Sequence, residues 1–423
     1  MSKPLKGKIE NTTAYMLAIP RNEADIESPD KLFAHLRGAK DFTLMNISHD
    51  EELDCPTLYI AYKEEIYLIA VEPADFNYDE GYFKHKLSDE NIEELEAATT
   101  GLQLSMLFSK HALDSYHLLL KVLYCLVPDL IGVYNCNSFM LLSPLWVKTA
   151  AEAATPPAPS YLYTIHAVSD DNGKVWLHTH GLNCCGVMDL EIIETDKEHY
   201  SKHGDVLTNM ADNAISKGTL ADEKELIYTG SLASGEYLVT TWVNWREGLK
   251  MYDENIMGGI KDREDEAHAQ DTGLVFAYLS EGDYKKGKYT PLTKIKEEEW
   301  ENPLYMVSDE ETLRMSELAR ERLPYLREGL KRDGAQAIVK IGLDVDKDSL
   351  EEAGCDHEHI WFEVDEITGD RISGSLIQEP YFVASMHEGS TGTYTFDKLT
   401  DWILYVDDQK ITPDSVYLLS LLN

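Results

Sequence analysis

The stretch AAEAATPPAPS, from Ala150 to Ser160, limits most strongly how this chain folds. Two adjacent prolines and a third nearby exclude a continuous helix and favour an extended, polyproline-like segment. The chain has 423 residues, which is more than one ordinary domain holds. We therefore predict a domain boundary here and a second one between Glu301 and Ser308, where Asn302-Pro303 ends an acidic stretch.

The three resulting regions combine helix and strand patterns, which predicts a multidomain α+β fold with mixed or antiparallel sheets and packed helices. An N-terminal α+β domain covers residues 1–155. A middle α+β domain covers residues 161–303 and opens with a β-hairpin, because Asp170–Gly173 contains Asn-Gly and separates two β-rich runs. The C-terminal domain covers residues 304–423.

The C-terminal domain begins with one helix and continues with strands. Ser308 and Glu311 form a capping box, and the helix pattern continues to near Arg332. The later apolar runs, up to SVYLLSLL at residues 415–422, have strand-like patterns. We therefore expect one helix packed on an antiparallel sheet.

The chain is strongly acidic, with 76 acidic and 38 basic residues and a formal net charge of -38. A protein that grips a phosphate backbone needs clustered Lys and Arg, so we expect no nucleic-acid partner. Residues 301–423 hold 26 acidic and 11 basic residues, a net charge of -15, so the acidity is distributed along the chain. It serves either solubility or the attraction of a basic protein partner.

The N-terminus, the longest apolar stretch and the cysteines indicate the cellular compartment. The N-terminal sequence has no apolar core of a signal peptide. The most apolar stretch, Leu118–Val147, is interrupted by charged residues and prolines, so we expect no membrane association. Six cysteines without a CxxC pair are typical of a reducing cytosol, which predicts a cytoplasmic protein. The oligomeric state is left open.

Two familiar binding motifs are incomplete. Gly282 and Gly287-Lys288 have the spacing of a phosphate-binding loop, but Tyr289 stands where Ser or Thr is needed. The run that begins at Asp344 resembles a calcium loop, but Cys355 occupies the position of the closing Glu. The sequence therefore predicts no cofactor and assigns no catalytic residue.

Two pairs of histidines each share a strand face with a tryptophan. These six candidate binding residues are Trp176, His178, His180, His357, His359 and Trp361. Imidazoles at positions i and i+2 can share a Zn²⁺ ion, but a site needs a third ligand. The plainer interpretation is a set of polar residues on a solvent-facing or half-buried sheet face. The sequence thus assigns no metal site, and His178 and His180 are the candidates if a metal binds.

The segment HEHIWFEV alternates between two faces. Ile360 and Phe362 fall on the core face, whereas His359 and Trp361 fall on the available face. Glu358 falls on the apolar face, so its carboxylate needs a partner such as a backbone N–H or Lys340.

Several of these residues carry family resemblances. Glu358–Trp361, Gly374-x-Leu376, Glu379-Pro380-Tyr381, Gly389 and Asp401-Trp402 resemble the YegJ-like family, domain of unknown function 2314. The preceding residues resemble the bacterial domain-of-unknown-function family 4026, through the apolar helix ending at Pro128-Asp129, the PPAP linker and WLHTHGL. The resemblance implies a bacterial protein and no assigned activity. Relatives of the C-terminal module are suspected among toxin-immunity proteins, which is an analogy.

Two hypotheses about function follow. The lack of a complete catalytic motif and the distributed acidity favour a non-catalytic protein-binding module, of a toxin-immunity or stress-related kind, with a basic partner. The alternative is a metal-dependent hydrolase or ligand-binding enzyme that uses the strand histidines. An acidic mimic of nucleic acid is a third possibility that the sequence leaves open.

Overall fold

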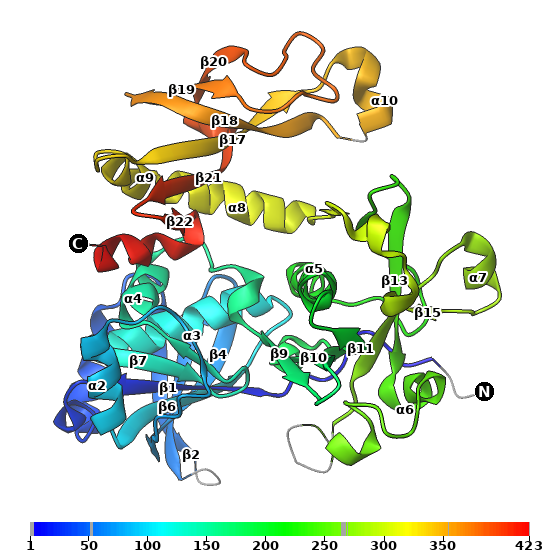
Figure 1. Ribbon diagram of the computed structural model, residues 1–423. Coiled ribbons are helices and arrows are strands. Elements are labelled where there is room, and N and C mark those ends of the chain that lie inside the picture. The colour runs from blue at the N-terminus through cyan, green and yellow to red at the C-terminus, as the bar shows by residue number, and fades with distance from the viewer. Residues whose placement is uncertain (1–3, 51–53, 264–267, 269, 354, 423) are drawn as a thin grey trace. The chain divides into compact units, whose positions relative to one another are not determined.

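The computed structural model describes residues 4–50, 54–263, 268, 270–353 and 355–422 (Figure 1). These residues group into two compact units. Unit 1 comprises Met1–Val147 and Pro159–Ser308, and unit 2 comprises Lys148–Ala158 and Asp309–Asn423. The multidomain α+β fold is confirmed by the three open sheets and their helices. The division into three domains stays a prediction.

The first sheet of unit 1 has the strand order β2-β3-β4-β6-β1-β7-β8-β5. Its strands are β1 (Thr13–Pro20), β2 (Thr43–Asp50), β3 (Cys55–Tyr62), β4 (Glu65–Asp75), β5 (Phe83–Lys84), β6 (Thr100–Leu107), β7 (Leu130–Asn135) and β8 (Met140–Leu142). Neighbouring strands run antiparallel, except that β5 and β8 are parallel. Lys63 takes a positive φ of 52° in the tight turn between β3 and β4, as short hairpin turns often require.

The helices that accompany this sheet are α1 (Pro29–Ala34), α2 (Asp89–Ala97), α3 (Ala112–Leu126) and α4 (Pro144–Glu152). Ser88 caps α2, since its hydroxyl accepts a hydrogen bond from the Asn91 backbone N–H. Helix α3 is buried around most of its circumference. This explains why apolar residues occur on nearly all faces of the helix. Helix α4 continues to Glu152, so the first residues of the predicted proline-rich linker are helical.

The second sheet of unit 1 has the order β16-β12-β13-β14-β11-β10-β9, with β15 beside β14. Its strands are β9 (Thr164–Ser169), β10 (Lys174–His180), β11 (Leu190–Asp196), β12 (Ile227–Ser231), β13 (Tyr237–Asn244), β14 (Gly273–Ala277), β15 (Thr290–Pro291) and β16 (Leu304–Tyr305). Its helices are α5 (Tyr200–Lys217), α6 (Trp245–Gly248) and α7 (Glu281–Lys285). The predicted hairpin is present as β9 and β10, and β9 forms an edge of the sheet.

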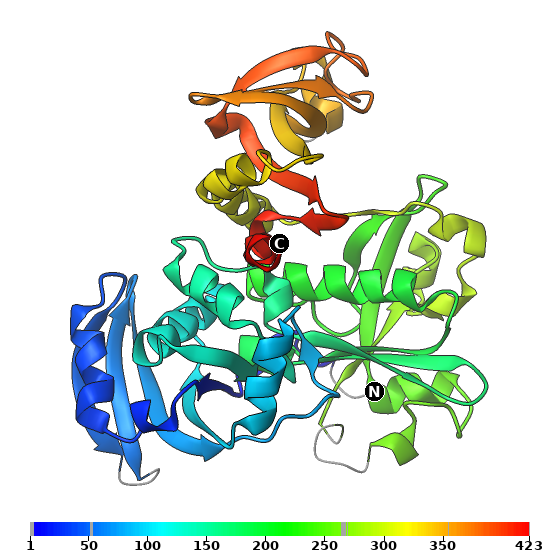
Figure 2. The ribbon, with the colours of Figure 1, turned by 60° about the vertical axis from the view of Figure 1, so that its left-hand side comes forward.

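Unit 2 is an antiparallel sheet of order β20-β19-β18-β17-β21-β22. Its elements are α8 (Asp309–Glu321), α9 (Leu323–Gly329), β17 (Gln336–Asp344), α10 (Leu350–Ala353), β18 (His357–Thr368), β19 (Arg371–Leu376), β20 (Thr391–Thr395), β21 (Leu399–Val406) and β22 (Gln409–Ile411). Ala319 and Leu326 of the helices share one core with Ile360, Phe362 and Trp402 of the strands. Figure 2 shows α8 and α9 together beside the strands of this sheet.

Two details of unit 2 differ from the sequence predictions. The helix expected up to Arg332 is broken between α8 and α9, because Pro324 lacks the N–H that a continuous helix would need. The run SVYLLSLL was expected to be a strand, and this expectation is wrong. It lies in a 3₁₀ helix, Pro413–Leu421, which begins with proline after a reciprocal cap between Thr412 and Ser415.

Among the residues that the structure describes, no helix has the length and apolar character that a membrane crossing requires.

Candidate metal centre

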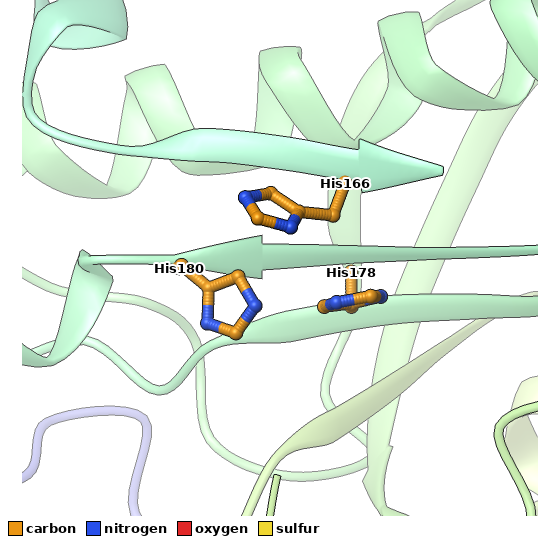
Figure 3. Close-up of side chains that lie close together, drawn as sticks. All are labelled: His166, His178 and His180. Atoms are coloured by element: carbon orange, nitrogen blue, oxygen red, sulfur yellow. The ribbon is translucent and has the colours of Figure 1, made fainter. Parts of the chain in front are cut away.

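The hairpin of β9 and β10 brings three histidines together. His178 lies directly opposite His166 in the antiparallel register, and His180 lies on the same face of β10. The ring centroids are 5.4 Å apart for His166 and His178, 4.5 Å for His166 and His180, and 4.8 Å for His178 and His180. Figure 3 shows the three rings converging on one space from the two strands.

The separation of the ring nitrogens suits a shared metal ion. One nitrogen from each of His166, His178 and His180 lies within 4.8 Å of the other two. Nitrogen ligands of a tetrahedral Zn²⁺ ion lie roughly 3.3 Å apart, given Zn–N bonds of about 2.0–2.1 Å. Modest side-chain rotation would close the remaining difference.

The three rings are shielded by neighbouring aromatic side chains. Only 3% of His178 and 9% of His180 is exposed, so the expectation of a solvent-facing or half-buried pair is wrong. Trp176 packs on His178 with ring centroids 4.1 Å apart. Phe139, from the turn between β7 and β8, lies 5.1 Å from His180 and 5.8 Å from His166.

Burial keeps two of these imidazoles in their neutral form. It lowers the pKa of His178 to about 2, with smaller contributions from the neighbouring histidines and Arg263, and it lowers the pKa of His166 to about 4. Within the described residues, His166 Nε2 and His178 Nδ1 are buried and have no hydrogen-bond partner. A bound metal ion would provide these buried nitrogens with the partner that they lack, and it requires imidazoles in the neutral form.

A cavity of about 390 Å³ adjoins the cluster. It is lined by His178 and His180, by residues of β1 such as Thr13 and Tyr15, and by His268. His268 Nε2 lies 3.2 Å from His178 Nε2. An ion at the cluster would therefore have open space beside it, and it would have a fourth imidazole in the same cavity.

Asp189 anchors the backbone around the cavity. Its carboxylate accepts hydrogen bonds from Thr179 Oγ1 at 2.8 Å, the Leu182 backbone N–H at 3.2 Å and Asn183 Nδ2 at 2.8 Å. Burial raises the pKa of Asp189 to about 7, and the hydrogen bonds from Thr179 and Leu182 oppose that rise. The contacts hold the turn that follows His180.

A buried ion pair between Glu191 and Arg263 holds the Trp176 side chain in place. Glu191, which lies opposite His178 in β11, accepts hydrogen bonds from Arg263 at 2.5 and 2.8 Å and from Trp176 Nε1 at 2.9 Å. Glu191 and Arg263 are both almost fully buried, so each charge depends on the other. This arrangement fixes the indole against which His178 packs.

The other three candidate residues lie in unit 2 and form no such cluster. His357 Nε2 lies 3.1 Å from Asp344, His359 Nδ1 lies 3.1 Å from Thr400 Oγ1, and Lys340 lies over the Trp361 ring. Among the described residues, the group His166, His178 and His180 is the one set of three or more side chains with metal-ligand spacing.

Glu358, beside these residues on β18, has the backbone partners that the sequence required. Its carboxylate accepts hydrogen bonds from the N–H groups of Tyr381 and Phe382, each at 2.8 Å. This contact fixes the segment after β19, and no ligand is needed to explain the half-buried acid.

Sequence reasoning missed His166, Asp189, Glu191 and His268. The hairpin turn already contained a signal for His166, since pairing Ser169 with Val175 places His166 opposite His178. Asp189 and Glu191 flank Leu190 at the start of β11, but charged residues there carry no distinctive signal. His268 lies far from the hairpin in sequence, and no pattern links it to the cluster.

Family models match three parts of the chain. Residues 14–157 match the model described as Protein of unknown function (DUF4026) N-terminal, and residues 165–276 match its C-terminal counterpart. Residues 326–417 match Uncharacterized protein conserved in bacteria (DUF2314). The chain joins a DUF4026 region to a DUF2314 region. The predicted resemblances to families 4026 and 2314 are thereby confirmed, and the histidine cluster falls within the C-terminal DUF4026 part.

Neither the comparison with curated proteins nor the comparison with solved structures gave a match.

Proposed function

We propose that this protein binds a divalent transition-metal ion through His166, His178 and His180, and that the ion supports hydrolytic chemistry in the adjoining cavity. The observation that carries the proposal is the convergence of three imidazoles, each with one nitrogen within 4.8 Å of the others. The supporting observation is the pair of buried nitrogens that have no partner among the described residues.

The donor set favours zinc as the first metal to test. Imidazole suits zinc, copper, nickel and iron, whereas magnesium and calcium prefer oxygen ligands. Three histidines with one open position are one of the arrangements that catalytic zinc sites use, and structural zinc sites close all four positions with protein ligands. A bound ion would lower the pKa of a coordinated water, and the cavity would admit a small substrate.

Metal titration tests the first half of the proposal. Metal-free protein titrated calorimetrically with Zn²⁺ should bind one ion per chain, and H178Q/H180Q should abolish that event. The matched control is H357Q/H359Q, which removes the same residue types at the same spacing from a strand of unit 2. Absence of binding by the unaltered protein, or equal affinity in H178Q/H180Q, would contradict the assignment.

Hydrolysis of model substrates tests the second half. The zinc-loaded protein should hydrolyse 4-nitrophenyl acetate or bis(4-nitrophenyl) phosphate faster than the background reaction. Zinc-loaded H357Q/H359Q should keep that rate, and H178Q/H180Q should reduce it to background. Zinc binding without hydrolysis would remove the catalytic half and leave the metal site.

A non-catalytic protein-binding role, of a toxin-immunity or stress-related kind, is the second proposal. It is supported by the net charge of -38, which would attract a basic partner over a long range. Capture of a basic partner that is lost as salt rises would support it, whereas salt-independent capture would oppose its electrostatic basis.

The same proposal includes a bacterial, cytoplasmic setting. The description of the DUF2314 family as conserved in bacteria supports the source. The six cysteines, which include no CxxC pair, support a reducing compartment. Fractionation of the native host, with the protein in the membrane or secreted fraction, would contradict it.

A further inference from the structure

A groove on the second sheet of unit 1, separate from the histidine cavity, is lined by tyrosines and carboxylates. Its volume is about 280 Å³. The side chains that carry the argument are Tyr228, Glu236, Tyr237, Tyr278, Glu281 and Tyr284. None of the residues lining the groove is a lysine or arginine.

The strand register explains why the tyrosines gather. Tyr228 of β12 lies opposite Val239 of β13, and Tyr237 lies two residues before Val239, on the same face. Tyr278 follows β14, and its backbone N–H donates to the Val239 carbonyl at 2.9 Å. Helix α7 then contributes Tyr284.

The four rings form two nearly perpendicular pairs. Tyr228 and Tyr237 have centroids 6.1 Å apart and an interplanar angle of 86°, and Tyr278 and Tyr284 have values of 5.3 Å and 75°. Perpendicular aromatic rings around a small space resemble the aromatic cages that hold ammonium groups.

Two of these rings remain largely in solvent. Tyr228 is 57% exposed and Tyr237 is 71% exposed, so the fold gains little from either. By contrast, Tyr284 Oη donates to Glu225 at 3.0 Å, and Tyr278 Oη donates to the Lys224 carbonyl at 2.9 Å. The hydroxyl groups of Tyr278 and Tyr284 are therefore held by hydrogen bonds within the protein.

The charges at the groove complement a cation. Tyrosine ring faces carry negative electrostatic potential. Glu236 has no ion-pair partner among the described residues, whereas Glu281 pairs with Lys285 one turn later in α7. The groove thus offers aromatic faces and one uncompensated carboxylate.

We infer that this groove binds an arginine or lysine side chain in a basic segment of a protein partner. Its size suits one side chain of the partner, and the net charge of the chain would steer a basic segment toward it. The inference is independent of metal binding, since no residue that lines the groove belongs to the histidine cavity.

The test uses fluorescein-labelled hexa-arginine as the probe, with binding to the full chain measured by fluorescence anisotropy at 150 mM salt. Y228A/Y237A should bind the probe roughly tenfold more weakly, because two cation–π contacts are lost without any change in net charge. Y228F/Y237F keeps both rings and should retain the affinity.

The matched control is Y381A, which removes a 79% exposed tyrosine from unit 2 and should leave the affinity unchanged. E236Q should weaken binding and reduce its dependence on salt. A strongly acidic protein attracts any basic peptide, so equal affinity in Y228A/Y237A and the unaltered chain would overturn the inference. A failure of the unaltered chain to bind the probe at 150 mM salt would overturn it too.

Discussion

His178 and His180 differ from His357 and His359 in what the neighbouring strand places opposite them. His178 faces a third imidazole, from His166, across β9 and β10. His359 faces Gly342 on β17, which has no side chain to offer. The two pairs have the same spacing, but only His178 and His180 gain a third imidazole for a metal ion. The residue on the neighbouring strand makes this difference.

His268 distinguishes an open metal site from a closed one. If the ion keeps an open position, H268Q should retain zinc affinity within about threefold and should lose hydrolytic activity, since His268 lines the cavity beside the cluster. Calorimetry and a rate assay on the same preparation measure both quantities. Loss of the ion in H268Q would instead identify His268 as a fourth ligand and contradict the open site.

His203, outside the metal cavity, links stability to pH. It is buried, bonded to Thr195 Oγ1 at 2.6 Å and packed on Trp300. Burial, with a smaller contribution from His199, lowers its pKa to about 4, although Asp196 opposes the shift. Because the unfolded chain takes up this proton at higher pH than the folded chain, the stabilisation is present above pH 6.5 and is lost as pH falls toward 4.

The expected loss from His203 between pH 6.5 and pH 4 is about 3 kcal/mol in the free energy of unfolding. Urea unfolding at pH 7 and pH 5 should show a smaller pH dependence in H203Q than in the unaltered protein. The exposed His387 provides the control, and H387Q should keep the original dependence. An unchanged dependence in H203Q would show that other groups govern acid unfolding.

At the scale of elements, the turn after β10 holds the end of the histidine strand. Gly181 has a φ of +112°, and a Cβ there would lie 2.6 Å from the Leu162 carbonyl oxygen. The 3₁₀ helix Leu182–Cys185 follows, and its first backbone N–H bonds to Asp189. Glycine is therefore required both by the backbone conformation and by the close approach of the Leu162 carbonyl, which lies just before β9.

G181A should lower the free energy of unfolding by several kcal/mol, roughly 2–4, and should weaken zinc binding by displacing His180. Gly173 is the matched control, because its φ is +80° and a Cβ there would meet no atom within 4 Å. G173A should cost only about 1 kcal/mol and leave zinc affinity intact. Equal effects of the two substitutions, measured by urea unfolding and calorimetry, would refute the role of the contact with Leu162.

The sequence contained most of the elements and part of the site. The turn Asp170–Gly173 sets the hairpin register, so His166 was within reach of a register argument. The burial of the cluster could not be predicted from the sequence. Phe139 and His268 come from distant segments, and only tertiary packing brings them to the hairpin. The final apolar run was misassigned because a leucine-rich segment suits either a strand or a buried helical turn, and Pro413 decides for the turn.

At the scale of the whole molecule, the segment Lys148–Ala158 belongs to unit 2 despite its distance in sequence. The Glu321 carboxylate accepts hydrogen bonds from the backbone N–H groups of Ala154 and Thr155 at 2.8 and 3.0 Å. The Arg314 guanidinium donates to the Pro156 carbonyl at 3.2 Å. The proline-rich stretch is thus a structural part of this unit as well as a connection.

A fragment of residues 304–423 should fold, because its core joins helices α8 and α9 to the strands of the sheet. It should melt cooperatively but at a lower temperature than unit 2 in the full chain, since Glu321 and Arg314 lose their backbone partners. A peptide of residues 148–158 added in excess should raise the melting temperature, and a scrambled peptide of the same composition should not. Broad melting without cooperativity would contradict the unit boundary.

The central claim is that three imidazoles share one metal ion, and X-ray absorption at the zinc edge tests it most directly. The zinc-loaded protein should show three imidazole nitrogens and one further light atom at about 2.0–2.1 Å. Cys184 also lines the cavity, so a sulfur at about 2.3 Å would reveal a different ligand set. Three imidazoles that disappear in H178Q/H180Q would support the account, whereas an all-oxygen shell or a sulfur-dominated shell would contradict it.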